Sequence, residues 1–178
     1  LLPRVASGSC SREKKKIFLY HKDNLITKDS GMESTFYAEE KWYYSSGAEW
    51  AVKKISEEAI TLNLNWPDIK ELSQTIDVNF EDKRLIFKSN IKSGNINISG
   101  FRYSFIVQDN YEEAFYEGHV VDLPGDYKEQ EIRFNDGVVP GYIGLKPGKD
   151  LPALIVRSEE GLSLHNSDRI LKSRKLNV

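Results

Sequence analysis

Cysteine is almost missing from this chain of 178 residues, which contains one, Cys10. A single cysteine forms no disulfide within the chain, so a disulfide framework is excluded as the source of its stability. The small residues before Cys10 are of the kind that precede a lipidated cysteine, but Arg4 places a charge where an apolar signal would lie. A disordered tail is therefore the preferred interpretation, and lipidation of Cys10 stays open. Long apolar runs are also missing, and we predict no transmembrane segment.

Metal ligands and nucleophile motifs are equally scarce. The histidines, His21, His119 and His165, have no second histidine or cysteine at metal-ligand spacing, so no metal and no cofactor are predicted. The G-x-S-x-G motif of serine hydrolases is missing too. Residues 137–148 are glycine-rich but carry two prolines and lead into no helical pattern, which indicates turns rather than a phosphate-binding loop.

Acidic residues supply the remaining candidates for catalysis. Glu117 and His119 would share one face of a strand, which permits an acid–base pair. The preferred interpretation is an exposed strand histidine beside a solvated carboxylate. Adjacent acids such as Glu39-Glu40 point to opposite faces of a strand, so they indicate turns and hydrated surface. No catalytic residue is predicted, although a sugar hydrolase with two carboxylates from distant segments stays open.

Charge of neither sign dominates. The 25 lysines and arginines nearly balance the 27 aspartates and glutamates, for a formal net charge of −2. That balance gives no reason to predict a nucleic-acid partner. A hydrophobic share of 39% with 29% charged residues is typical of a folded domain rather than a disordered chain.

Alternation of apolar and polar residues is abundant. It is unbroken at 60–66, recurs at 76–80, and continues at 101–107 in the most aromatic window of the sequence. Short strands at spacings of about 8–12 residues, with turn residues between them, are typical of sandwiches and barrels. We predict an all-β fold: a single antiparallel β-sandwich, jelly-roll or immunoglobulin-like, with at most one short helix. Residues 100–123 are predicted to form its organising hairpin, turning at 108–110.

Local assignments follow from the same pattern. Residues 35–44 are predicted as one strand and 22–32 as a loop. Residues 45–59 fit either a helix that begins with a Ser46–Glu49 capping box, or one arm of a hairpin. We favour the hairpin, with strands at 50–55 and 60–66, because it agrees with the β pattern on both sides.

The predicted organisation is one domain with two tails. Residues 1–16 have no periodicity and are predicted to be a flexible lead-in, 17–168 form the sandwich domain, and 169–178 form a basic tail. No internal repeat or shift in composition marks a second domain.

Aromatic residues are the best candidates for a binding surface. Consecutive aromatics on a strand cannot all face the core, so at least one ring in 42–44 must point outward. By parity, Tyr43 is expected outside, and Tyr111 is expected in the turn of the organising hairpin. Burial of most of these rings in the core stays an open alternative. The predicted ligand-binding residues are Trp42, Tyr43, Tyr44, Trp50 and Tyr111.

The function expected from these observations is a non-catalytic binding or interaction module of a secreted or cell-envelope protein. Its ligand would be a carbohydrate or a protein, since exposed Trp and Tyr suit both. One alternative is a hydrolase acting on sugars, and another is a structural subunit that pairs through strand edges. The oligomeric state is not predicted.

Overall fold

Strands dominate the computed structural model of the chain, which describes residues 2–5, 16–21, 24–56, 58–82, 84–123, 125, 131–134, 138–148, 151–165 and 170–173. Strand accounts for 66% of the structure and helix for 2%, the latter a 3-10 turn, η1 (Ser45–Gly47). The all-β prediction with at most one short helix is confirmed. The described strands form three antiparallel sheets, so a single sandwich is not confirmed.

The largest sheet, sheet A, has the strand order β1-β2-β4-β10-β17-β16-β13, with β3 beside β2 and β5 beside β4. Its strands are β1 (Leu2–Val5), β2 (Ile17–His21), β3 (Asn24–Leu25), β4 (Thr27–Ala38), β5 (Lys41–Tyr44), β10 (Ile98–Val107), β13 (Glu131–Ile132), β16 (Leu162–His165) and β17 (Ile170–Ser173).

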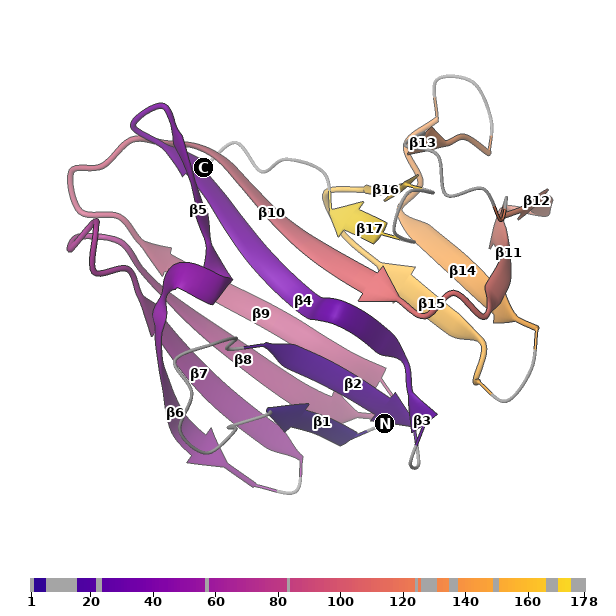
Figure 1. The fold of residues 1–178 in the computed structure, drawn as a ribbon, viewed down its shortest axis with the longest axis horizontal. Helices are drawn as coiled ribbons and strands as arrows, with labels where there is room; N and C mark the ends of the chain where they lie inside the picture. Colours follow the sequence, from indigo (N-terminus) through magenta and orange to yellow (C-terminus); the bar gives the residue numbers. More distant parts are fainter. Residues whose placement is uncertain are drawn as a thin grey trace.

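Two smaller sheets complete the fold (Figure 1). Sheet B has the order β6-β7-β8-β9, with β6 (Glu49–Ile55), β7 (Ala59–Asn65), β8 (Ser73–Glu81) and β9 (Arg84–Lys92). Sheet C has the order β12-β11-β14-β15, with β11 (Tyr111–Tyr116), β12 (His119–Asp122), β14 (Tyr142–Pro147) and β15 (Leu154–Arg157).

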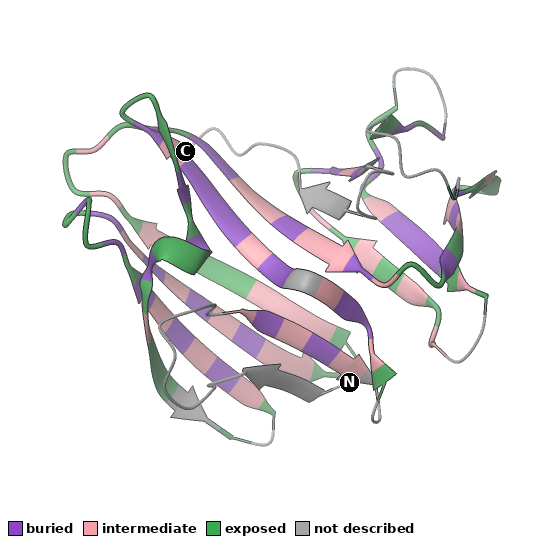
Figure 2. Ribbon diagram, in the orientation of Figure 1, coloured by how far each residue is buried: buried purple, intermediate pink, exposed green. Residues whose placement is uncertain are grey.

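The main core lies between sheet B and the β2, β4 and β10 part of sheet A. Figure 1 shows sheet B crossing behind these strands, and Figure 2 shows buried residues alternating along β7 and β8. The ring of Phe36 on β4 lies 5.0 Å from those of Trp66 and Phe101. Phe36 is fully buried, and such burial stabilises a fold by about 1.5–3 kcal/mol per side chain. Phe36 therefore faces the core on the side of sheet B.

A polar network crosses the same core. Gln74, which is 1% exposed, accepts a hydrogen bond from Ser34 Oγ at 2.8 Å through its Oε1. Its amide nitrogen donates to Ser89 Oγ at 2.9 Å and to Tyr103 Oη at 3.1 Å. Buried polar groups need such partners, because an unpaired one costs about 1–3 kcal/mol. The network ties β4 and β10 of sheet A to β8 and β9 of sheet B.

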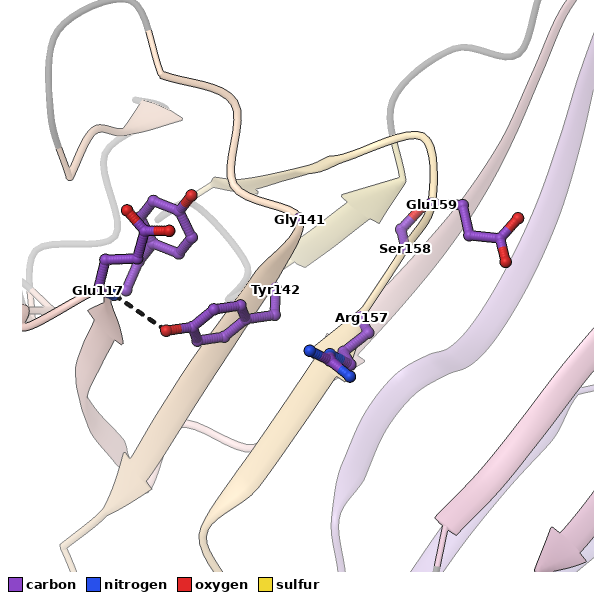
Figure 3. Close-up of a pocket in the computed structure, with 7 residues that line it drawn as sticks. Glu117, Gly141, Tyr142, Arg157, Ser158 and Glu159 are labelled. Atoms are coloured by element: carbon purple, nitrogen blue, oxygen red, sulfur yellow. Dashed lines mark hydrogen bonds between the residues drawn. The ribbon is translucent and has the colours of Figure 1, made fainter.

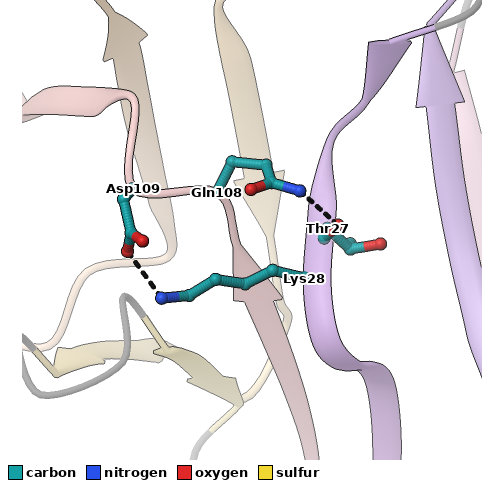
Figure 4. A network of polar contacts seen from close by, with 4 residues as sticks. All are labelled: Thr27, Lys28, Gln108 and Asp109. Atoms are coloured by element: carbon teal, nitrogen blue, oxygen red, sulfur yellow. Dashed lines mark hydrogen bonds and ion pairs between the residues drawn. The ribbon is translucent and has the colours of Figure 1, made fainter.

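The connection at 108–110 leads from sheet A into sheet C. In Figure 4, Gln108 Nε2 donates to the carbonyl of Thr27 at 2.9 Å and Lys28 forms an ion pair with Asp109. The predicted hairpin of residues 100–123 is wrong, because β10 pairs with β4 and β17 while β11 pairs with β12 and β14. A polar break of this kind suits a crossover as well as a hairpin, and only long-range pairing distinguishes them.

Two further assignments need correction. Residues 35–44 are not one strand: Glu39 and Glu40 form a two-residue turn between β4 and β5, with φ of 49° and 61°. The predicted loop at 22–32 contains β3 and the start of β4, a polar stretch held between β2 and β10 by long-range pairing.

The hairpin at 50–55 and 60–66 is confirmed, since β6 pairs with β7 from Glu49–Asn65 to Ile55–Ile60. Strand β1 lies in the predicted lead-in and pairs with β2, and β17 lies in the predicted tail and pairs with β10 and β16. Apolar residues such as Leu2 and Ile170 in these segments give them strand character. The proposed domain limits stay a prediction, and Cys10 lies outside the described residues. No helix in the described part of the chain is long and apolar enough to cross a membrane.

Candidate functional site

The best candidate site is the surface of β5, β4 and β10 that points away from sheet B. Because Phe36 faces Trp66 in the core, its neighbours Thr35 and Tyr37 face the other way. The register then places Tyr37 opposite Trp42, and Thr35 opposite both Tyr44 and, on β10, Arg102. We call this surface the outer face; it consists of Glu33, Thr35, Tyr37, Trp42, Tyr44 and Arg102.

Two of the three aromatic side chains of the outer face, Trp42 and Tyr44, are exposed, and Tyr37 is half-buried. Trp42 is 38% exposed and Tyr44 is 45% exposed. The rings of Tyr37 and Trp42 lie 5.0 Å apart with an interplanar angle of 52°. The guanidinium carbon of Arg102 lies 4.8 Å from the centroid of the Trp42 ring, a cation–π contact worth about 0.5–2 kcal/mol. Trp42 is thus held in place from two sides while part of it remains accessible to a ligand.

Polar groups lie among these rings. Glu33 accepts a hydrogen bond from Ser46 Oγ at 3.2 Å. Burial raises the pKa of the Glu33 carboxyl above its usual value, although the Ser46 hydrogen bond and the charges of Lys16 and Arg102 act to lower it. Within the described structure, Thr35 Oγ1 and Arg102 Nε are buried and have no hydrogen-bond partner. The outer face therefore combines flat apolar rings with a half-buried carboxyl, a half-buried guanidinium and a buried hydroxyl.

Only two of the five predicted site residues, Trp42 and Tyr44, lie on the outer face. Tyr43 is 9% exposed and belongs to the core, opposite Phe36. The prediction that Tyr43 faces outward was wrong because it assumed that residues alternate between two faces without a break from 35 to 44. The turn at Glu39 and Glu40 ends β4 and starts β5, so the alternation begins again after it.

The other two predicted residues lie elsewhere. Trp50, on β6, donates from its Nε1 to the carbonyl of Ser45 at 2.8 Å and is partly buried. Tyr111 is fully buried at the start of β11 rather than in a turn, and its hydroxyl donates to the carbonyl of Pro152 at 3.0 Å. The structure does not bring Tyr111 to the outer face.

Sequence reasoning missed Tyr37 and Arg102 as members of the site. A signal for Arg102 was present, because it alternates with Phe101, which is buried, and Tyr103, which packs against the core, and so had to face outward. Its position over Trp42 was not predictable, since 60 residues separate the two in sequence and only the pairing of β4 with β10 brings them together.

A second concave region lies at one end of sheet C (Figure 3). This open pocket of about 470 Å³ is lined by Tyr116, Glu117, Gly141, Tyr142, Arg157, Ser158 and Glu159. Tyr142 accepts a hydrogen bond at its hydroxyl from the backbone N–H of Glu117 at 3.1 Å, and its ring lies 6.0 Å from the Arg157 guanidinium. Tyr116 is buried and Tyr142 is half-buried, so this pocket offers less free aromatic surface than the outer face.

The acid–base pair considered from the sequence is not assembled on a strand. Glu117 occupies the turn between β11 and β12 with φ of 46°, and His119 is exposed at the start of β12. Among the described residues, no group of three or more His, Cys, Asp or Glu side chains could hold a metal ion.

Comparison with known proteins identifies no relative. No family model matches the chain, and no curated protein and no solved structure is significantly similar to it. The geometry of the outer face therefore carries the functional argument by itself.

Proposed function

We propose that this protein is a non-catalytic binding module whose outer face binds a carbohydrate. The observation that carries the proposal is the pair Trp42 and Tyr44, two residues apart on β5 and exposed on the same face. Aromatic rings offer a flat apolar surface, and neighbouring polar groups can bond hydroxyls that flank a sugar ring. An exposed aromatic cluster of this kind is expected to mark a binding surface.

The same proposal extends to architecture and location. We infer that sheets A and B act as the two layers of one sandwich, supported by the contact of Phe36 with Trp66. A secreted or cell-envelope location is part of the proposal, because saccharide polymers are abundant there. Fractionation of cells that produce the full-length natural protein would test this location.

A binding assay with variants of the outer face tests the function. Wild-type protein is titrated with soluble oligosaccharides while its tryptophan fluorescence is recorded, and Trp42→Ala and Tyr44→Ala are expected to weaken binding at least tenfold. Ile155→Ala is the control, because Ile155 is 60% exposed but lies on sheet C. Equal saccharide binding by the wild type and the three variants would contradict the proposal. A protein that binds a peptide but none of the saccharides would contradict it as well.

A hydrolase acting on sugars is an alternative function, and the raised pKa of the Glu33 carboxyl is the observation that favours it. Burial raises this pKa, as a general acid requires. Such an enzyme needs a second carboxylate about 5–10 Å away. The polar groups described as acting on Glu33 are instead Ser46, Lys16 and Arg102. Release of sugar by the wild type that Glu33→Gln abolishes would favour the enzyme over the binding module.

A structural subunit that pairs through sheet edges is favoured by a different observation. Val120 on β12 and Ile155 on β15 are 61% and 60% exposed, on the two outer strands of sheet C. Exposed apolar edge strands can pair with another chain. Sedimentation at several concentrations tests this alternative, with Ile155→Lys expected to remove any self-association that it measures.

A further inference from the structure

Arg102 is a cation without a counter-ion in the described structure. It forms no hydrogen bond and no ion pair with any residue that the structure describes, and its contact is with the ring of Trp42. A guanidinium normally uses its fork of N–H donors on a carboxylate or phosphate. On the outer face these donors have no such partner, although the side chain is half-buried.

Glu33 is the nearby carboxyl group that could have paired with this cation. It lies on β4 opposite Ser104, two residues beyond Arg102 on β10 and so on the same face, and its carboxyl accepts a hydrogen bond from Ser46. Its separation from the guanidinium exceeds that of an ion pair, and burial disfavours its ionised form. Glu33 and Arg102 therefore interact through their charges but form no ion pair, and the N–H donors of Arg102 have no carboxylate partner among the described residues.

From the unpaired guanidinium stacked on Trp42 beside Tyr44, we propose that the ligand is an acidic saccharide. Its uronate carboxylate accepts hydrogen bonds from Arg102, while a sugar ring lies against Tyr44 and the exposed part of Trp42. Charge-assisted hydrogen bonds from arginine to a carboxylate are short and about twice as strong as neutral ones. This inference rests on the proposed carbohydrate-binding function and specifies the charge of the ligand.

The surroundings favour a saccharide over other anions. Nucleic acid requires several phosphate contacts from clustered lysines and arginines, whereas two cations, Lys16 and Arg102, are described as acting on Glu33 and the whole chain has a net charge of −2. Tyr44, which is exposed, carries a hydroxyl next to its ring, and this suits the alternating polar and apolar surface of a sugar.

The experiment compares one saccharide with and without its charge. Oligogalacturonate and the same oligomer after reduction of its carboxylates to alcohols are titrated by calorimetry into the wild type and into Arg102→Gln and Arg102→Lys. We expect the wild type to prefer the acidic oligomer at least tenfold, and Arg102→Gln to lose that preference. Arg102→Lys keeps the positive charge but lacks the planar pair of guanidinium donors, so it should retain part of the preference for the acidic oligomer. Thermal unfolding of each variant at the same midpoint as the wild type would show that the variants are folded.

Arg157→Gln is the matched control, because Arg157 also lies over an aromatic ring but outside the outer face. It should bind both oligomers as the wild type does. Equal affinity for the acidic and reduced oligomers, with Trp42→Ala weakening both, would overturn this inference and leave the carbohydrate-binding function standing. Failure to bind either oligomer would overturn the inference, and failure of a wider set of neutral saccharides as well would overturn the function. Binding of poly-glutamate or single-stranded DNA in place of the acidic oligomer would also overturn it.

Discussion

The ring of Phe115 occupies the space into which a side chain at position 144 would point. Phe115 and Gly144 are directly opposite each other on β11 and β14, and a Cβ added to Gly144 would overlap the ring. Glycine is required here by this close approach, because the outer end of the Phe115 ring lies where a Cβ would be.

Gly144→Ala should therefore destabilise the protein by about 1–3 kcal/mol, since Phe115 must leave its position to make room. The measurement is the free energy of unfolding in urea. Gly141→Ala is the control, because no atom lies within 4 Å of a Cβ built there. Equal stability of Gly144→Ala and the wild type would show that the ring moves without cost.

The turn between β4 and β5 predicts a stabilising substitution. Glu39 and Glu40 both have positive φ, a conformation that costs a residue with a side chain about 1 kcal/mol relative to glycine. Two-residue hairpin turns with positive φ at both positions, the type I′ turns, favour the sequence Asn-Gly. Glu39→Asn combined with Glu40→Gly should raise the unfolding free energy by about 1 kcal/mol, measured by thermal or urea unfolding. Glu160→Gly, in a turn without this constraint, should bring no such gain, and a loss of stability in the double variant would contradict the turn geometry.

Buried tyrosines predict a loss of stability in alkaline solution. Burial raises the pKa of Tyr103 to about 12, against the hydrogen bonds with Ser89 and Gln74, and burial raises the pKa of Tyr111 to about 12 as well. The unfolded chain loses these protons near pH 10, so the folded state holds more protons between pH 10 and 12. The stabilisation of the folded state by the raised pKa values of these two tyrosines is therefore complete below pH 10 and is lost as the pH rises toward 12.

Urea unfolding between pH 8 and pH 11.5 measures this effect. The wild type should lose stability above pH 10, and Tyr103→Phe should show a shallower decline from a lower starting stability, because it also leaves Gln74 with one fewer partner. An unchanged slope in Tyr103→Phe would mean that Tyr103 ionises in the folded protein as readily as in the unfolded chain.

Local alternation was enough to predict the strands that pair with their neighbours in sequence. The β6–β7 hairpin follows from the unbroken period of two at 60–66 and the polar residues before it. The pattern failed where distant strands decide the structure. The polar start of β4 is a strand because β2 and β10 lie on either side of it, and β10 and β11 separate because each has partners elsewhere.

The candidate site was predictable in part for the same reasons. The requirement that an aromatic ring in 42–44 faces outward was right in principle, but the turn at Glu39 and Glu40 lacks the glycine or asparagine that usually marks it, so the parity was assigned wrongly. Arg102 joins Trp42 only through the β5-β4-β10 pairing, which no local pattern encodes.

Mapping of the bound ligand by nuclear magnetic resonance tests the central claim most directly. Backbone amide signals of the ¹⁵N-labelled protein are followed during titration with oligogalacturonate and with its reduced form. The account predicts that the amides of Tyr37, Trp42, Tyr44 and Arg102 shift together with one saturating curve, while those around Tyr142 and Arg157 stay in place. Shifts confined to the pocket at Tyr142, or no shifts on β4, β5 and β10 with any saccharide, would contradict it.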